Sequence, residues 1–468
     1  MMQLSQVARA VNGELFGADV LLQNISINTR DDCRGRLFVA LKGENFDAHE
    51  FVSQAEQAGA TALLVEQAVE SDLPTVRVNS THQALADLAS WWRSQFALPV
   101  IGITGSVGKT TVKEMLACIF AEFGQGVVTK GNLNNEIGVP LTLMCLKPED
   151  RYAIVEMGMN HAGEIGRLSA MARPTIALVN NAAAAHLENL GTIEAVANAK
   201  GEIYQGLSID GIAIINNDDE YAELWRELAK GYSVMTFGLS VDGNSNADVT
   251  ASYEEKKHGL VIKVKANKQK LKIKLNSVGE HSVVNALAAV AVALAANISS
   301  DSIEAGLANF KPVNGRLNIQ SLAGIELIDD TYNANPASMR AAINVLVQSD
   351  DNLLVIGDMA ELGAAAEVEH KVLGEQAKRR GVKALYVCGE YAELVATSFG
   401  AGAIAFTSQA ALIERLCGNQ KNRDQLSGTI LVKGSRSAKM ERVVEALHRQ
   451  LLSKRVDQTS SVSSQGEI

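Results

Sequence analysis

The hydrophobic pattern changes along the chain, and the first change predicts a domain boundary. Residues 1–98 alternate short helical and strand-like segments, which is typical of a small α/β domain. From Pro99, continuous Val and Ile runs alternate with helical patterns, as in VIGITG followed by TVKEMLACIFAEFG. Such runs predict parallel strands that helices cover on both faces. We therefore expect a central domain at 99–314 that is built on a parallel sheet.

Two further changes complete the predicted fold. The segment KKHGLVIKVKANKQKLKIKL alternates polar and apolar residues, which predicts an antiparallel piece appended to the central sheet. A new series of strands, IELIDD, NLLVIGD, ALYVCGE and GTILVKG, predicts a Rossmann-like domain at 315–455. Residues 456–468 are rich in Ser and Gln, which predicts a disordered tail. The expected fold class is thus α/β with three domains.

Composition excludes several classes of protein. With 468 residues, 47% hydrophobic and 21% charged, the chain has the composition of a globular protein. Its formal net charge of -10 gives no global attraction to nucleic acid or to an anionic membrane, so an anionic ligand must be held locally. Five cysteines without a CxxC pair predict neither a disulfide framework nor a thiolate zinc site. No signal peptide or spanning segment is evident, so we expect a soluble cytoplasmic protein without stable membrane insertion.

The strongest chemical signal is the glycine-rich stretch GSVGKTT between a buried strand and a helix. Glycines let backbone N–H groups turn toward phosphate oxygens, Lys109 can reach the outer phosphates, and the Thr110 hydroxyl can bind Mg²⁺. The strict phosphate-loop pattern requires glycine at the position of Ile103, so it is not fully met. The context still predicts a nucleotide phosphate site formed by Gly105, Ser106, Val107, Gly108, Lys109, Thr110 and Thr111.

Three further candidates follow the next buried strands. Glu156 ends the strand YAIVEMG, and a buried carboxylate is costly unless it is paired or binds metal. His186 follows the strand TIALVNN, where α/β sheets place ligands, although a helix-cap or core histidine is an open alternative. Taken by itself, Lys200 in AKGEI is consistent with a solvated helix surface.

Polar residues also gather near the boundary of the second and third domains. Asn285 in GEHSVVN can pair with an adenine edge, and Arg316 in NGRL suits phosphate. DDTYNANPASM brings Asp330, Asn333 and Asn335 to the end of a strand, which is typical of a ligand loop. Asp358 in VIGDMAELG and Lys433 and Arg436 in VKGSR occupy similar positions.

Together these motifs resemble those of the ATP-dependent Mur ligases, which add amino acids to the peptide of the bacterial cell-wall precursor. The likeness covers nearly the whole chain and rests on GSVGKTT, VEMG, AHLE, AKGEI and GEHSVVN. SINTR, LKGENFDAHEF, EMGMNHAGEI, DDTYNANPASM, GDMAELG and VKGSRS are similar to the branch that adds D-alanyl-D-alanine. The resemblance implies that ATP activates UDP-N-acetylmuramoyl-tripeptide as an acyl phosphate, which the dipeptide amine then attacks. It also implies that the reaction releases ADP. Separately, we expect the protein to be a monomer.

The resemblance further implies a role for each candidate. Lys109, Glu156, His186 and Lys200 would be catalytic, and Mg²⁺ would be held by Thr110, Glu156, His186 and a carbamylated Lys200. The phosphate loop, Asn285, Arg316 and Asp330 would bind ATP. The precursor and the dipeptide would contact Ser26, Thr29, Arg30, Lys42, Asn135, Asn160, His161, Asn333, Asn335, Lys433 and Arg436.

Two other functions stay open from sequence alone. A sister Mur ligase or a folylpolyglutamate-type synthetase would share the core, although no DNPR-like stretch of a diaminopimelate-adding relative is present. A P-loop switch or scaffold would bind nucleotide without ligating anything. That interpretation leaves Glu156, His186, Lys200 and the third-domain motifs unexplained.

Overall fold

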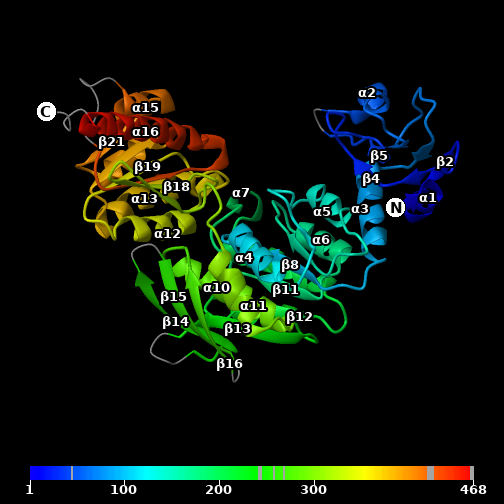
Figure 1. Ribbon diagram of the computed structural model, residues 1–468, viewed down its shortest axis with the longest axis horizontal. Helices are drawn as coiled ribbons and strands as arrows, with labels where there is room; N and C mark the ends of the chain where they lie inside the picture. The colour runs from blue at the N-terminus through cyan, green and yellow to red at the C-terminus, as the bar shows by residue number, and fades with distance from the viewer. Residues whose placement is uncertain (44–45, 241–244, 257–258, 267–268, 419–425, 464–468) are drawn as a thin grey trace.

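The computed structural model describes residues 1–43, 46–240, 245–256, 259–266, 269–418 and 426–463. Three α/β domains follow one another around a curved molecule, with the two ends of the chain in its outer domains (Figure 1). The expected three-domain α/β architecture is confirmed. None of the helices in the described part of the chain has the length and apolar character needed to cross a bilayer.

The N-terminal domain contains a small mixed sheet with the strand order β2-β7-β6-β5-β4. β4 to β7 pair in parallel, so the ends of β4 and β5 bring Ser26 and Lys42 to the same edge. A separate antiparallel pair, β1 with β3, lies beside α1. The elements are β1 (Met2–Gln3), α1 (Leu4–Ala10), β2 (Glu14–Phe16), β3 (Leu21–Leu22), β4 (Asn24–Ser26), β5 (Arg36–Val39), α2 (Val52–Gln57), β6 (Ala62–Val65), β7 (Thr75–Arg77) and α3 (Thr81–Arg93).

Helix α3 joins the first domain to the second. Its apolar side chains share one hydrophobic cluster with the middle domain, and Trp92 Nε1 donates to the Leu146 carbonyl at 3.1 Å. Arg93 is buried and donates from Nε to the Ala172 carbonyl at 2.9 Å. Burial lowers the pKa of Arg93 to about 10. These contacts fix the end of the first domain against the second.

The central domain is a long sheet with the order β16-β15-β14-β13-β12-β11-β8-β10-β9. β9 to β14 pair in parallel, and β14 to β16 are antiparallel, as the alternating segment predicts. Every residue of β8 is buried, as expected for a strand covered on both faces. The strands are β8 (Val100–Thr104), β9 (Val127–Val128), β10 (Ala153–Glu156), β11 (Ile176–Val179), β12 (Ile212–Asn216), β13 (Ser233–Leu239), β14 (Val249–Lys256), β15 (Gly259–Ala266) and β16 (Gln269–Leu275).

Helices cover both faces of the parallel strands. α4 (Lys109–Ala121), α10 (Glu280–Ala295) and α11 (Ser300–Asn309) pack on one face. The other face packs against α5 (Gly138–Leu143), α6 (Glu164–Ala172), α8 (Ile193–Gly201) and α9 (Ala222–Leu228). Alternate residues of β8, such as Val100 and Ile101, point into these two different clusters, as the two-residue period of a strand requires.

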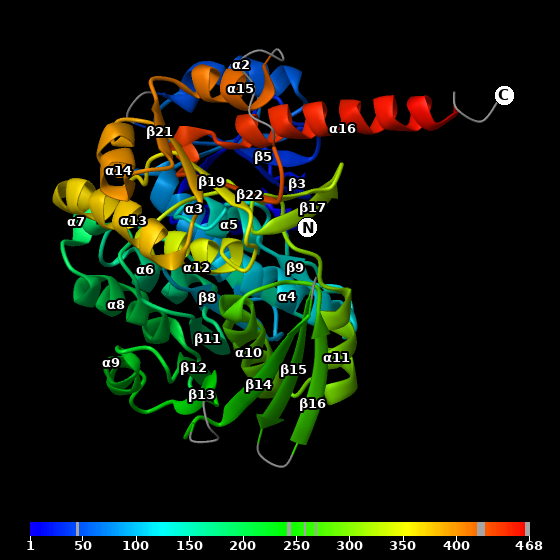
Figure 2. The same cartoon turned by 90° about the vertical axis from the view of Figure 1, so that its left-hand side faces the viewer.

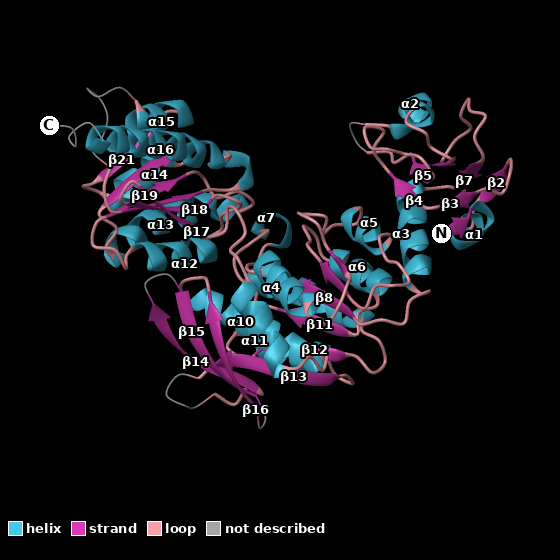
Figure 3. Ribbon diagram, in the orientation of Figure 1, coloured by secondary structure: helices cyan, strands magenta, loops and turns pink. Residues whose placement is uncertain are grey.

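The C-terminal domain repeats this layered plan with the order β17-β18-β22-β19-β20-β21, in which only β17 pairs antiparallel among the described strands. Helices lie above and below the sheet (Figure 3). The elements are β17 (Asn318–Leu322), β18 (Ile325–Asp330), α12 (Pro336–Leu346), β19 (Asn352–Ile356), α13 (Ala366–Arg380), β20 (Ala384–Cys388), α14 (Ala392–Phe399), β21 (Ala403–Phe406), α15 (Gln409–Cys417), β22 (Thr429–Lys433) and α16 (Glu441–Ser463).

The end of the chain differs from the predicted tail. A disordered segment is expected from residue 456, whereas α16 continues to Ser463 and projects beyond the domain (Figure 2). No Gly or Pro interrupts the sequence between Glu441 and Ser463, so nothing in the backbone ends the helix earlier. The remainder of the expected tail, 464–468, lies outside the described residues.

Candidate functional site

A cavity of about 900 Å³ lies between the central and C-terminal domains. The carboxyl ends of parallel strands from both sheets meet there, which is where ligands bind in open α/β sheets. The candidate residues that line it are Ser106, Val107, Gly108, Lys109, Thr110, Thr111, Asn135, Glu156, Asn160, His186, Asn285, Arg316, Asp330, Asn333, Asn335 and Lys433. The structure thus brings together most of the polar residues that sequence reasoning selected from these two domains.

The glycine-rich loop connects β8 to α4. Gly108 has a φ of +82°, and a Cβ there would lie 2.4 Å from Oδ1 of Asn285, so glycine is required. Lys109 begins α4 and donates from Nζ to the Gly105 carbonyl at 2.6 Å. Burial lowers the pKa of Lys109, against the opposing influence of Glu156. The loop therefore has the strand–loop–helix geometry of a phosphate site, with its lysine folded back on its own backbone.

Glu156 is buried at the end of β10 and accepts two hydrogen bonds. The Thr110 hydroxyl donates to Oε2 and Asn134 Nδ2 donates to Oε1, each at 2.9 Å. Arg316 donates from a guanidinium nitrogen to Thr110 Oγ1 at 3.0 Å. A carboxylate and a hydroxyl in contact are oxygen ligands that suit Mg²⁺, so these residues fit that ion.

His186 lies at the start of the short helix α7 (Leu187–Leu190), with a φ of +56°. Its Nδ1 is 2.8 Å from Oε2 of Glu361, a residue of the third domain that also lines the cavity. His186 lowers the pKa of the Glu361 carboxyl. Sequence reasoning chose Asp358 from the same motif, but Asp358 accepts backbone N–H groups of Glu390 and Tyr391 instead.

Lys200 is buried on α8, with only 1% of its surface exposed. No described residue accepts a hydrogen bond from its amine. Burial, reinforced by the charge of Lys109, lowers the pKa of Lys200 well below the ordinary value. The solvated-surface alternative is therefore wrong for this lysine.

The described residues contain no group of three or more His, Cys, Asp or Glu side chains arranged to hold a metal. The expected ligand set does not require such a group, because Thr110 and a modified Lys200 are not of these four types. Glu156 and Thr110 provide oxygen ligands. The amine of Lys200 has no hydrogen-bond partner among the described residues, so it is available for carbamylation. The residues present therefore fit Mg²⁺.

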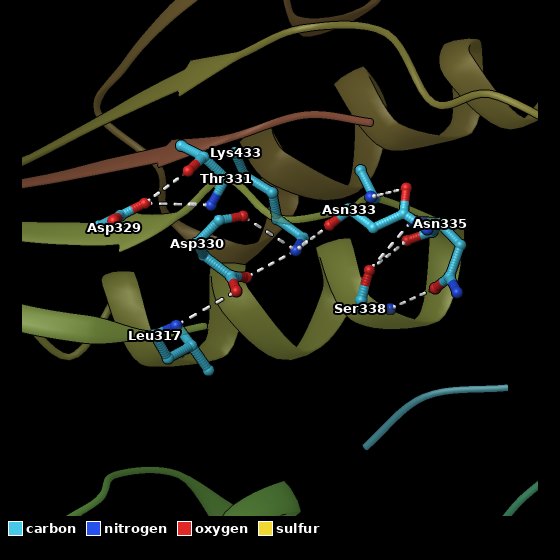
Figure 4. A network of polar contacts seen from close by, with 9 residues as sticks. Leu317, Asp329, Asp330, Thr331, Asn333, Asn335, Ser338 and Lys433 are labelled. Carbon is cyan, nitrogen blue, oxygen red and sulfur yellow. Dashed lines mark hydrogen bonds and ion pairs between the residues drawn. The ribbon is translucent and has the colours of Figure 1, made fainter. Parts of the chain in front are cut away.

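In the third domain, the loop after β18 is held by a buried ion pair (Figure 4). Lys433 Nζ lies 2.6 Å from Oδ2 of Asp330 and also donates to the Asn333 carbonyl at 2.8 Å. Burial raises the pKa of Asp330, and Lys433 acts in the opposite direction. The Leu317 amide donates to Oδ1 of Asp330 at 3.2 Å. Lys433 thus stabilises the loop in this structure.

Arg316 links the domain boundary to the phosphate loop. Its guanidinium lies 4.1 Å from the centre of the Tyr332 ring while it bonds to Thr110, and its buried Nε has no partner among the described residues. Asn285 accepts a hydrogen bond from Asn180 Nδ2 at 3.0 Å. Arg316 and Asn285 therefore both lie at the phosphate loop, as expected for residues that would contact a phosphate or a base.

The remaining candidates lie outside this cavity. Ser26, Thr29, Arg30 and Lys42 belong to the first domain, where the buried Ser26 hydroxyl donates to the Asn28 carbonyl at 3.1 Å. His161 is exposed beside Glu164, at 2.9 Å. Arg436 is exposed and lies 3.2 Å from Glu441. Gly105 belongs to the phosphate loop, and Lys200 on α8 is close enough to Lys109 for that charge to lower its pKa, but neither is among the residues that line the cavity.

Comparison with known proteins identifies the family. The model "Mur ligase family, catalytic domain" matches residues 22–93, "Mur ligase middle domain" matches 103–293, and "Mur ligase, glutamate ligase domain" matches 315–436. UDP-N-acetylmuramoyl-tripeptide--D-alanyl-D-alanine ligase of Escherichia coli is 45% identical over 95% of this chain and 98% of its own length. The chain belongs to the Mur ligase family. The resemblance seen in the motifs is thereby confirmed.

Relatives and solved structures are similar to this Mur ligase over nearly all of its length. The ligase of the same name from Bacillus subtilis is 32% identical over 95% of this chain and 98% of its own. A crystal structure of MurF from Acinetobacter baumannii superposes with a TM-score of 0.88 at 35% identity, covering 95% and 98% of the two chains. MurF from Thermotoga maritima in complex with ADP gives 0.81 at 28%, covering 94% and 100%.

Sequence reasoning missed Asn134 and Glu361, which touch Glu156 and His186. Asn134 adjoins the candidate Asn135 in the run NLNNE, so the sequence signal was the run of asparagines, and both residues line the cavity. Asn135 accepts the backbone N–H of Gly138 at 2.9 Å, and its contact with substrate stays a prediction. Glu361 belongs to the motif VIGDMAELG, which was already selected from the sequence, so the motif itself was the signal for this residue. Its role depends on a contact between domains, which a local pattern does not contain.

The loop after β18 also gives a prediction for the stability of this Mur ligase, at Asn335. This residue caps α12, because its side chain accepts the Ser338 N–H at 2.8 Å. The Ser338 hydroxyl in turn accepts the backbone N–H of Asn335, which completes a capping box. We expect Asn335→Ala to lower the free energy of unfolding by about 1 kcal/mol, measured by urea titration. Asn335→Asp should keep the cap, and Asn333→Ala, at an exposed position, should have a smaller effect. Unchanged stability with lost activity would instead assign Asn335 to ligand binding.

Proposed function

We propose that this Mur ligase uses ATP to join D-alanyl-D-alanine to UDP-N-acetylmuramoyl-tripeptide, with release of ADP and phosphate, in the cytoplasm. The observation that carries the proposal is the 45% identity with the E. coli ligase of that activity, which extends through all three domains. The third domain matters most here, because its loops border the cavity opposite the phosphate loop. Membership in a ligase family argues against a switch or a scaffold.

The chemistry explains the composition of the cavity. A carboxylate is a poor electrophile, so a tripeptide carboxylate oxygen attacks the γ-phosphorus of ATP, and ADP leaves. The dipeptide amine then attacks the acyl carbon, phosphate leaves, and the amine loses its proton. The first step brings a carboxylate toward a triphosphate, so positive charge is needed where the two anions meet. Lys109 and Arg316 are the cationic residues that line the phosphate-loop side.

The protein's own residues have distinct positioning roles in this scheme. The backbone of Gly105–Gly108 turns toward the triphosphate, and Lys109 exchanges the Gly105 carbonyl for a phosphate oxygen. Glu156 and Thr110, with His186 and a carbamylated Lys200, are the residues that would hold Mg²⁺, which when bound would offset the charge of the phosphates. Arg316 and Asn285 approach ATP from opposite sides of the domain boundary, with Asp330 beside them. Ser26, Thr29, Arg30 and Lys42 hold the uridine diphosphate end at the separate first domain.

The acceptor side remains assigned to the third domain. Asn333 is exposed at the cavity, and Asn160 and Asn135 line it from the central domain, near the path of the reacting arm. His161 and Arg436 lie outside this cavity, so their assignment requires precursor or dipeptide to extend past its rim. We assign the protein as a monomer in this proposal.

An ADP-release assay with a panel of substrates tests the function. We expect ADP to form only when the nucleotide-linked tripeptide and D-alanyl-D-alanine are both present, with the pentapeptide product identified by mass spectrometry. Tripeptides ending in diaminopimelate or lysine define the donor, and D-alanyl-D-lactate and L-alanyl-L-alanine test acceptor strictness. ADP release with diaminopimelate or D-glutamate as acceptor, and not with the dipeptide, would make the protein a sister ligase.

A further inference from the structure

One surface of the central domain has a charge opposite to that of the protein as a whole. Between Val249 and Leu275 the sequence has eight lysines against two glutamates, a net +6 in a chain whose total is -10. The remainder of the chain therefore carries -16. Five of these lysines are exposed on β15 and β16, where they form what we call the lysine face: Lys263, Lys265, Lys270, Lys272 and Lys274.

The strand register places these lysines on one side of the sheet. Lys263 pairs with Lys272 and Lys265 pairs with Lys270, directly across the antiparallel strands. The alternate residues, such as Ile262 and Leu271, are buried against α10 and α11. Figure 2 looks onto the side of the sheet that these helices leave uncovered. The lysine face is thus the solvent side of a sheet whose other side is core.

The charges on this face are only partly compensated. Glu254 lies 2.8 Å from Lys263 and 3.3 Å from Lys256, and Glu304 accepts the backbone N–H of Lys272. No described acidic residue forms an ion pair with Lys265, Lys270 or Lys274. Like charges directly opposite each other destabilise a sheet. Lysines on an edge strand hinder its pairing with another chain, which explains the lysines of β16. This reason does not apply to β15, which lies between β14 and β16 and has no free edge.

We propose that the lysine face docks this enzyme on an anionic lipid surface. Lysine carries a compact, hydrated charge and lacks the bidentate guanidinium geometry of arginine. Rows of lysine are therefore better suited to attract a surface of many anionic lipid headgroups than to recognise one phosphate group in a fixed geometry. Protein interfaces are depleted in lysine and use aromatic anchors, and single-stranded nucleic acid binds on aromatic platforms. The outward side of β15 and β16 presents no aromatic residue. The acidic remainder of the chain is repelled by the same surface, which orients the molecule with this face toward it.

Sedimentation with vesicles tests the proposal on the full-length enzyme. We expect binding to vesicles that contain phosphatidylglycerol at low salt, loss of binding at high salt, and no binding to pure phosphatidylcholine. The variant K263Q/K265Q/K270Q/K272Q/K274Q should lose binding by about tenfold or more. The matched control K147Q/K230Q/K311Q/K371Q/K383Q changes five other exposed lysines and the net charge equally, and it should bind like the wild type.

Both variants should keep the wild-type melting temperature and ADP-release rate in solution, because none of these ten lysines lines the catalytic cavity. Absence of wild-type binding at low salt would overturn the proposal. Equal losses in the two variants would also overturn it, because total charge rather than the lysine face would then govern binding. Binding to polyglutamate or DNA but not to vesicles would assign the face to another polyanion and reject the lipid.

Discussion

Replacing Lys109 with alanine should abolish ligation while the protein stays folded. The ammonium group stands at the start of α4, on the wall of the cavity, and its described hydrogen bond is to the carbonyl of its own loop. Removing the side chain therefore disturbs the packing little. It also removes a buried charge, so we do not expect the variant to lose stability. In the reaction this charge offsets the negative charge that builds on the transferred phosphoryl group. We expect the rate of ADP release to fall by at least about a thousandfold.

The measurement needs a control for charge and a control for folding. Lys130→Ala removes an exposed lysine outside this cavity and should leave the rate close to that of the wild type. Thermal melting should show Lys109→Ala as stable as the wild type. If the variant retained activity within tenfold of the wild type, the phosphate-loop assignment of GSVGKTT would be wrong. If it failed to fold, Lys109→Met would test the same charge with a better match in side-chain volume.

The sequence predicted those features of the fold that depend on local pattern. VIGITG and TIALVNN are buried strands because parallel strands covered on both faces need continuous apolar residues. The two-residue period of GLVIKVKA identified an antiparallel strand whose lysines face solvent. The loop GSVGKTT was recognisable even though Ile103 breaks the strict pattern, because its position between strand and helix carries the chemistry.

Contacts between distant segments could not be predicted in this way. Glu361 meets His186, and Arg316 meets Thr110, only because two domains are packed at a particular angle. Two candidates of the third-domain loop also have local partners that their motifs alone did not reveal. The side chain of Asn335 caps α12, since Asn before Pro at a helix start satisfies free N–H groups, and its contact with the dipeptide stays a prediction. Lys433 pairs with Asp330 in this structure, and its contact with the dipeptide stays a prediction.

Lys200 is expected to be carbamylated in the active enzyme, and the structure supplies a physical reason. An ammonium group next to bound Mg²⁺ would repel the ion, and it would stand in a buried position without an ion-pair partner. The depressed pKa of Lys200 favours the neutral amine, which is the form that attacks CO₂. In that step the nitrogen lone pair bonds to the carbon, and one proton leaves the nitrogen. The product is an anionic oxygen ligand on the same long side chain.

Replacing Lys200 with alanine should then reduce ADP release by about a hundredfold or more, with a short carboxylate restoring part of the rate. Isotopically labelled bicarbonate, followed by NMR, should give a carbamate signal in the wild type and none in Lys200→Ala. Lys113 serves as an internal comparison, because it is equally buried but donates to the Thr129 carbonyl at 2.8 Å and lies beside Glu114. That partnered amine should not be labelled. A fully active Lys200→Ala enzyme, or a wild type that carries no label when Mg²⁺ and ATP are bound, would refute carbamylation and leave Lys200 as an unmodified buried amine.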